Sequence, residues 1–202
     1  MIPSVLAQSF PVIDFEYYLW LEARSQSKNE YFYGHVYAMA GGTNNHGALS
    51  ANALVSLTRL LAAKRCIVRG SDVRVETPNS NAVFYPDVSV HCNQTLPGKA
   101  RTTKSPTLIV EILSPSTRNY DFTTKRKEYF LIPSLRHYLL IDSETVAASL
   151  YSRGEAQVWP KEPLHFASPT DSIPLEALAI KLKLKELYRE TGLLPTRNKS
   201  SV

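Results

Sequence analysis

Residues 107–113 read TLIVEIL, and this stretch is the clearest sign of a buried strand in the chain. It is nearly all apolar, as expected for a β-strand that other elements cover on both faces. Glu111 is the exception within it. Because a carboxylate buried without partners is costly, Glu111 needs a cation, a metal or hydrogen-bond donors nearby, or a place at an open strand end. The plainest interpretation is an ion pair with a structural arginine or lysine.

A second acid, Asp87, follows Pro86 in the preceding predicted strand, 83–90 (VFYPDVSV). Side chains alternate between the two faces of a strand, so Asp87 and the neighbouring valines point in opposite directions. The connection over 93–105 is short enough for the two strands to pair, which would bring Asp87 toward Glu111. Two hard oxygen ligands with open positions suit Mg²⁺, although Asp87 could equally end a turn after the proline.

Lys125 interrupts the apolar stripe of a helix predicted over 121–132. Tyr129 and Ile132 lie on that stripe at helical spacing, and Lys125 lies between them and the start of the helix. A lysine on a buried face is unusual unless it pairs with carboxylates or takes part in chemistry. The short connection from the strand before it lets Lys125 reach back toward Glu111, and the alternative is a lysine whose amine extends to solvent.

The remaining pattern predicts helices and strands in mixed order. Helices are expected over 14–24, from the polar loop 41–46 to about residue 64, and over 184–188. Strands are expected over 66–69, 72–77, 137–142, 147–152, 156–159 and 178–184, with a hairpin over 30–39. The order predicts a single α+β domain over residues 1–202 with a mixed central sheet.

Length and composition exclude several classes of protein. The chain has 202 residues, 44% hydrophobic and 20% charged, which is typical of one globular domain rather than of disordered or fibrous proteins. No apolar run approaches the roughly 18 residues of a membrane helix. The N-terminal stretch lacks the basic residues of a secretory signal. We therefore expect a cytoplasmic protein with no membrane attachment, in which Cys66 and Cys92 are reduced.

The net charge of +5 permits a polyanionic partner without requiring one. Candidate contacts to a nucleic-acid backbone are the basic residues expected at the surface, namely Arg69, Arg74, Arg118, Arg126 and Lys127. No basic block typical of a nucleic-acid-binding tail is present.

The motifs taken together resemble the Uma-type family of putative restriction endonucleases, which is common in cyanobacteria. The similar segments are Tyr-Pro-Asp87, Ile-Val-Glu111-Ile-Leu-Ser-Pro-Ser-Thr, Asp121-x-x-x-Lys125-x-x-x-Tyr129, the hairpin Glu30-Tyr-x-x-Gly-x-Val-Tyr-x-Met and His46. The resemblance covers about residues 15–188 and implies the PD-(D/E)xK nuclease superfamily. It therefore implies a restriction-endonuclease-like mixed β-sheet flanked by helices, and Mg²⁺-dependent hydrolysis of DNA phosphodiester bonds, with Mn²⁺ as a substitute.

Site residues follow from the resemblance position by position. Asp87 matches the acid of the PD element and Glu111 the acid of (D/E)xK, and both would bind the metal together with the backbone carbonyl of Ile112. Leu113 occupies the position of the usual lysine, and the family pattern implies that Lys125 replaces it.

Two further positions of the family pattern are Glu30, which would join the metal site or position the lysine, and His46, which would contact phosphate, assist proton transfer or only begin a helix. Asp121 is interpreted only as the N-cap of its helix.

Alternatives remain at the level of function. One is an inactive nucleic-acid-binding or scaffold protein that keeps the nuclease fold, and another is a metal hydrolase with a different substrate. A homodimer is expected, because two active sites related by a two-fold axis cut both strands of a duplex most simply. No organic cofactor is expected.

Overall fold

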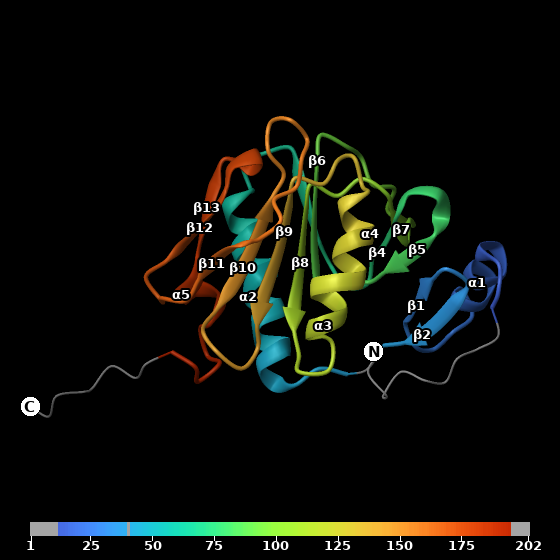
Figure 1. The fold of residues 1–202 in the computed structure, drawn as a ribbon, viewed down its shortest axis with the longest axis horizontal. Helices are drawn as coiled ribbons and strands as arrows, with labels where there is room; N and C mark the ends of the chain where they lie inside the picture. The colour runs from blue at the N-terminus through green and yellow to red at the C-terminus, as the bar shows by residue number, and fades with distance from the viewer. Residues whose placement is uncertain (1–11, 40, 195–202) are drawn as a thin grey trace, which may run out of the picture.

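The computed structural model describes residues 12–39 and 41–194. A six-stranded sheet lies at the centre, with helices on both faces, and a five-stranded sheet and a two-stranded sheet lie beside it (Figure 1). The α+β architecture predicted from the sequence is confirmed. The elements are α1 (Phe15–Glu22), β1 (Asn29–Phe32), β2 (His35–Ala38), α2 (Asn44–Leu60), β3 (Cys66–Gly70), β4 (Arg74–Glu76), β5 (Ala82–Phe84), β6 (Val88–Cys92), β7 (Thr102–Thr103), β8 (Leu108–Leu113), α3 (Arg118–Tyr120), α4 (Arg126–Phe130), β9 (His137–Asp142), β10 (Ala148–Ser152), β11 (Leu164–Phe166), β12 (Ser172–Leu175), β13 (Ile180–Lys183) and α5 (Leu184–Leu187).

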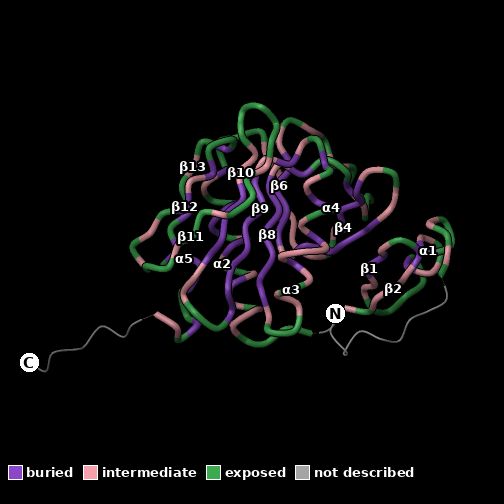
Figure 2. The backbone as a smooth tube through the Cα atoms, in the orientation of Figure 1, coloured by how far each residue is buried: buried purple, intermediate pink, exposed green. Residues whose placement is uncertain are grey.

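The central sheet has the strand order β11-β10-β9-β8-β6-β3. Strands β8 and β9 are parallel, whereas β8 pairs with β6 and β9 pairs with β10 in antiparallel fashion, so the sheet is mixed as predicted. A parallel pair needs a crossover connection, and the helical segment 118–130 supplies it. Figure 2 shows that the middle strands β6, β8 and β9 are buried along their length.

Helix α2 covers one face of this sheet. Its buried residues Leu49, Ala53 and Leu57 recur at helical spacing, and they pack against strand residues such as Val88 and Val110 in one apolar core. The Thr43 hydroxyl accepts a hydrogen bond from the His46 N–H at 3.2 Å and begins the helix. The predicted apolar stripe of this helix is confirmed.

The helical segment 118–130 covers the opposite face. It begins at Arg118, three residues before the predicted start, and it contains a π-helical turn over Asp121–Lys125 between α3 and α4. The interpretation of Asp121 as an N-cap is therefore wrong, because the residue lies inside the helix. Tyr129 and Ile132 are fully buried on this side of the sheet, as predicted.

The predicted strand 83–90 is two strands that belong to different sheets. Strand β5 pairs with β1 and β4, and β6 pairs with β3 and β8. The break falls at Tyr85-Pro86-Asp87, where the proline has no N–H for a strand ladder. The break places Asp87 at the junction of the two sheets.

Asp14 caps α1 beside this five-stranded sheet, as predicted, by accepting a hydrogen bond from the Tyr17 N–H at 2.7 Å.

The predicted strand over 156–159 is also wrong. The residues that pair with β10 are those of β11, several positions later. Trp159 instead stacks on Phe130, with ring centroids 3.9 Å apart, so its aromatic side chain contributes to packing and not to a ladder. Strand β13 and helix α5 confirm the predictions for residues 178–188.

Cys66 and Cys92 form a disulfide, which contradicts the expectation that both are reduced. They face each other across the antiparallel pair of β3 and β6, and a register that joins residues 26 positions apart could not be inferred from their spacing.

Within residues 12–39 and 41–194, no helix has the length and apolar character needed to cross a membrane.

Candidate active site

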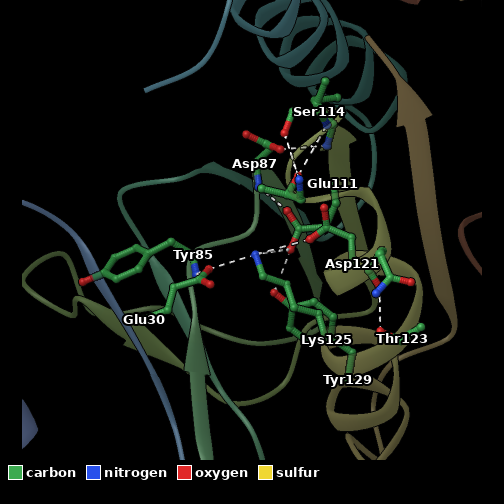
Figure 3. A network of polar contacts seen from close by, with 12 residues as sticks. Glu30, Tyr85, Asp87, Glu111, Ser114, Asp121, Thr123, Lys125 and Tyr129 are labelled. Carbon is green, nitrogen blue, oxygen red and sulfur yellow. Dashed lines mark hydrogen bonds and ion pairs between the residues drawn. The ribbon is translucent and has the colours of Figure 1, made fainter. Parts of the chain in front are cut away.

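Asp87 and Glu111 meet where β6 begins beside β8. The antiparallel register pairs Val88 with Val110, so the residues before and after them are also neighbours. The Asp87 N–H donates a hydrogen bond to Glu111 Oε2 at 3.4 Å, and the Ile112 N–H donates one to Asp87 Oδ2 at 2.7 Å. Figure 3 shows the two carboxylates close together. The structure thus brings together the two acids that the sequence singled out, with the Ile112 backbone between them.

Lys125 reaches this pair from the helical segment 118–130. Its Nζ lies 3.4 Å from Glu111 Oε1 and 2.9 Å from Glu30 Oε1. The Tyr129 hydroxyl, one helical turn further on, donates a hydrogen bond to the same Glu111 oxygen at 3.0 Å. Lys125 is only 6% exposed, so its amine does not extend to solvent.

Glu30 comes from β1 of the five-stranded sheet, whereas Glu111 comes from the central sheet. The Tyr85 N–H donates a hydrogen bond to Glu30 Oε1 at 3.1 Å and fixes the carboxylate beside the lysine. The Lys125 amine therefore bridges the two sheets at the point where the chain passes from β5 to β6 (Figure 3).

His46 lies in the first turn of α2, with Nε2 3.5 Å from Asp87 Oδ2. The hydrogen bond to Asp87 raises the pKa of His46 against the opposing effect of burial. The loop before the helix lies close to the ring, because a Cβ atom at Gly42 would come within 2.8 Å of it. All five residues predicted from the sequence for this site therefore lie in one place.

Leu113 lies on the same face of β8 as Glu111 and is buried in the core beneath the helical segment 118–130. A lysine at this position would have to displace apolar neighbours such as Tyr129 and Ile132. The cation of the site comes from the helix instead, as the sequence resemblance implied.

Two neighbours of Lys125 were missed by sequence reasoning. Asp121 is 2% exposed, and its Oδ1 lies 3.6 Å from Lys125 Nζ. Tyr129 was interpreted only as a core residue, yet its hydroxyl binds Glu111. The spacing of four residues from Asp121 to Lys125 and on to Tyr129 was the available signal, since such residues are neighbours on a helix.

Acidic side chains outnumber basic ones at this site. Carboxyl groups of Glu30, Glu111 and Asp121 lie 2.9, 3.4 and 3.6 Å from the Lys125 amine, and Asp87 contacts Glu111 and His46. Burial raises the pKa of Glu111 well above its usual value although Lys125 opposes the shift, and burial likewise raises the pKa of Asp121 to about 6. A cation bound among these acids would favour their ionised forms.

The pKa of Lys125 is also raised, but for a different reason. Burial alone would lower its pKa, but the carboxylates of Glu111, Glu30 and Asp121 together raise it well above its usual value. The lysine is therefore a permanent cation in this environment.

A pocket of about 150 Å³ opens onto these side chains. One wall comes from β2 and the loop before α2, and the other from the segment between β8 and the π-helical turn. The lining residues are Glu30, Tyr37, Ala38, Met39, Gly41, Gly42, His46, Tyr85, Asp87, Glu111, Ile112, Ser114, Ser116, Thr117, Tyr120, Asp121 and Lys125.

The expectation that Arg74 is exposed is wrong. Arg74 is buried and donates hydrogen bonds to Thr102 Oγ1 and the Tyr85 hydroxyl, at 2.7 and 3.4 Å. Arg118 forms an ion pair with Asp142, Arg126 binds the Tyr151 hydroxyl, and Lys127 is exposed.

The donor set fits Mg²⁺. Among the described residues, no three histidine, cysteine or acidic side chains are placed to hold a metal by themselves. Mg²⁺ usually takes only one or two carboxylates and completes its shell with water and phosphate oxygens, so Asp87 and Glu111 suffice if a backbone carbonyl and substrate oxygens join them. The excess of acidic over basic side chains around the pocket agrees with this fit.

The mixed sheet and its pocket define a fold of the restriction-endonuclease-like class. A family model described as "Putative restriction endonuclease", Uma2, matches residues 15–185. The chain therefore belongs to the Uma2 family, and this membership supports a nuclease function.

Two proteins of Synechocystis sp. PCC 6803 are similar in sequence. The uncharacterized protein slr1290 is 32% identical over 189 residues, covering 94% of this chain and 98% of its own length. The uncharacterized protein sll1609 is 30% identical over 144 residues, covering 70% and 81%. The crystal structure of a putative nuclease belonging to DUF820 from Anabaena variabilis superimposes with a TM-score of 0.73 at 18% identity, over 87% of this chain and 97% of that one, and confirms the fold.

Proposed function

We propose that the protein is a Mg²⁺-dependent endonuclease that hydrolyses phosphodiester bonds in DNA. The observation that carries this proposal is the convergence of Asp87, Glu111 and Lys125, from three separate elements, on one pocket. Membership of a family described as "Putative restriction endonuclease" supports the nuclease part of this proposal independently of the geometry.

Asp87, Glu111 and the backbone carbonyl of Ile112 would hold the metal ion. Such an ion lowers the pKa of a bound water and stabilises negative charge on phosphate oxygens. Asp87 is already oriented by the Ile112 N–H, and Glu111 by the Tyr129 hydroxyl, so both carboxylates are in place before substrate arrives.

Lys125 would act as a fixed positive charge. Its surrounding carboxylates keep it protonated, so it orients the attacking water and stabilises the extra negative charge that develops on the phosphate. Accepting a proton is not a role that suits an amine in this environment. Glu30 holds the amine from the side of the five-stranded sheet.

His46 would donate a hydrogen bond to a phosphate oxygen from the edge of the pocket. Its raised pKa favours the protonated form, which is the form that binds an anion most strongly.

The direct test is cleavage of supercoiled plasmid and of linear duplex by the purified protein with Mg²⁺ or Mn²⁺. We expect nicked or linear products with wild-type protein and none with Asp87→Ala, which circular dichroism should show to be folded. Cleavage that survives the Asp87→Ala substitution would exclude the proposal. DNA binding without cleavage by the wild-type protein would favour the alternative, an inactive nucleic-acid-binding protein.

Assembly and location remain predictions from the sequence. A homodimer would place two such pockets on the two strands of a duplex, and light scattering of the purified protein gives the mass that decides this point. A cytoplasmic location can be checked by fractionation of the source cells.

A further inference from the structure

Asp121 is a buried acid for which the proposed metal chemistry has no use. It is 2% exposed, lines the pocket and directs its carboxylate toward the Lys125 amine beside that of Glu111 (Figure 3). A buried carboxylate in such a place is costly unless its contacts serve a purpose. Its carboxylate forms an ion pair with Lys125, four residues further on in the same helical segment.

The π-helical turn explains how Asp121 reaches the site. An α-helix rotates by about 100° per residue, so residues spaced by four drift around the axis, and Tyr129 would lie about 80° from Asp121 in a uniform helix. The wider turn over Asp121–Lys125 reduces this drift. As a result Asp121, Lys125 and Tyr129 are all buried, at 2%, 6% and 0% exposure.

Asp121 does not complete the metal site with Asp87 and Glu111. No three acidic, histidine or cysteine side chains in residues 12–39 and 41–194 are close enough together to share one ion. Its ion-pair partner at the reaction centre is the ammonium of Lys125, so we expect its main effect on the reaction to pass through that group.

The Lys125 amine lies between two opposing attractions. Glu30 draws it toward the five-stranded sheet at 2.9 Å, whereas Glu111 and Asp121 hold it toward the central sheet and the helix at 3.4 and 3.6 Å. Without the charge of Asp121 the balance shifts toward Glu30, and the ammonium moves away from the carboxylate that would bind the metal.

We propose that Asp121 is a positioning residue, which holds the Lys125 ammonium beside Glu111 by means of the π-helical turn and does not bind the metal. This inference rests on the proposed nuclease function. A displacement of about 1 Å in a catalytic group can lower a rate by about 10²-fold, so a large effect on turnover is expected without direct contact to substrate.

A double-mutant cycle tests the dependence of Asp121 on Lys125. We expect Asp121→Asn to lower kcat for DNA cleavage by about 10- to 100-fold, with the KM for DNA and the Mg²⁺ half-saturation concentration unchanged. In a Lys125→Met background the same substitution should have no further effect. Thr124→Ala, a half-buried residue of the same turn, is the matched control and should cut like wild type.

A second readout needs no cleavage. In metal-free protein labelled with ¹⁵N-lysine, the buried Lys125 ammonium should give a slowly exchanging NMR signal that broadens or shifts in Asp121→Asn and persists in Thr124→Ala. The inference would be overturned if Asp121→Asn and Lys125→Met had independent, multiplicative effects on kcat. It would also be overturned if Asp121→Asn raised the Mg²⁺ half-saturation concentration more than tenfold, or if it left the ammonium signal unchanged. If the wild-type protein cuts no DNA, the nuclease proposal fails, whereas the NMR comparison still decides the role of Asp121.

Discussion

The two faces of the central sheet are built differently. The face beneath α2 is an apolar core, to which Leu57, Val110 and Leu139 all belong. The face beneath the helical segment 118–130 has an apolar core of its own, but Glu111 and Lys125 are buried at its edge. Strand β8 contributes to both, because successive side chains point to opposite faces. One face therefore mainly stabilises the fold, whereas the other holds buried charged groups at a cost in stability.

The largest effect is expected from a substitution on the face beneath the helical segment 118–130, which we call the charged face. The face beneath α2 is called the apolar face. Glu111→Gln should lower cleavage at least 10³-fold, equivalent to about 4 kcal/mol in activation free energy, because it removes a proposed metal ligand. Metal-free protein should become more resistant to heat, because burial disfavours the ionised form of Glu111 and raises its pKa, whereas glutamine carries no charge.

Plasmid cleavage and thermal unfolding of the same preparation measure both effects. Glu128→Gln is the matched control, because Glu128 is a buried acid of α4 that does not line the pocket, and it should retain cleavage. Equal loss of cleavage in Glu111→Gln and Glu128→Gln would contradict the distinction between an acid that lines the pocket and one that does not.

The next effect concerns the apolar face. Leu57→Ala should lower the free energy of unfolding by about 2–5 kcal/mol, since it leaves a cavity between α2 and the sheet. Cleavage per folded molecule should not change. Urea denaturation measures the difference, with Val55→Ala as a control because Val55 is 57% exposed on the same helix. A loss of activity larger than the loss of folded protein would show that the two faces are not separable.

The apolar face also contains a titratable group at its edge. Burial, with a smaller contribution from Arg136, lowers the pKa of His137 from 6.5 to about 4. Its unprotonated Nε2 accepts a hydrogen bond from the Ala177 N–H at 3.1 Å. Between pH 6.5 and 4 the unfolded chain therefore binds a proton that the folded protein does not. As the pH decreases through this range, the free energy of unfolding decreases by up to about 1.4 kcal/mol per pH unit.

Urea titrations at several pH values test this contribution. His137→Gln should give a shallower fall in stability than wild type between pH 6.5 and 4, and the two slopes should agree below that range. Identical slopes throughout would mean that His137 does not contribute to acid sensitivity.

The smallest effect is that of an ion pair on the charged face. Burial alone would raise the pKa of Asp142, but hydrogen bonds from Arg118 and the backbone N–H groups of Glu144 and Thr145 lower it. Asp142 therefore stabilises the fold above its unfolded pKa, and this contribution is lost as the pH falls. Because Arg118 is partly exposed, Asp142→Asn should cost about 1 kcal/mol or less at pH 7. A difference in melting temperature that does not narrow on acidification would contradict this explanation.

The elements with strong periodicity were predictable from the sequence. The stripe of α2, the apolar strand β8 and the single acid within it follow from local rules of spacing and burial. Glu111 and Lys125 stood out because each is a polar residue where the pattern requires an apolar one, and Asp87 because its predicted strand could pair with that of Glu111. Their convergence needed only two short connections, so it could be inferred without knowledge of the whole topology.

Other features depend on contacts that no local pattern encodes. The division of 83–90 between two sheets depends on which strands pair with each half. The π-helical turn, which places Asp121 inside the site, differs from an α-helix by its hydrogen bonding alone, and the disulfide depends on the register of β3 against β6. The composition of 156–159 favours a strand, but aromatic packing of Trp159 on Phe130 prevails.

The central claim is that Asp87 and Glu111 bind one divalent cation beside Lys125. Crystals grown with Mn²⁺ should give an anomalous difference peak in contact with both carboxylates, at about 2.1 Å, and the peak should disappear in crystals of Asp87→Ala. A Mn²⁺ peak elsewhere in the molecule with none between these two carboxylates, or one that persists there in Asp87→Ala, would contradict the account.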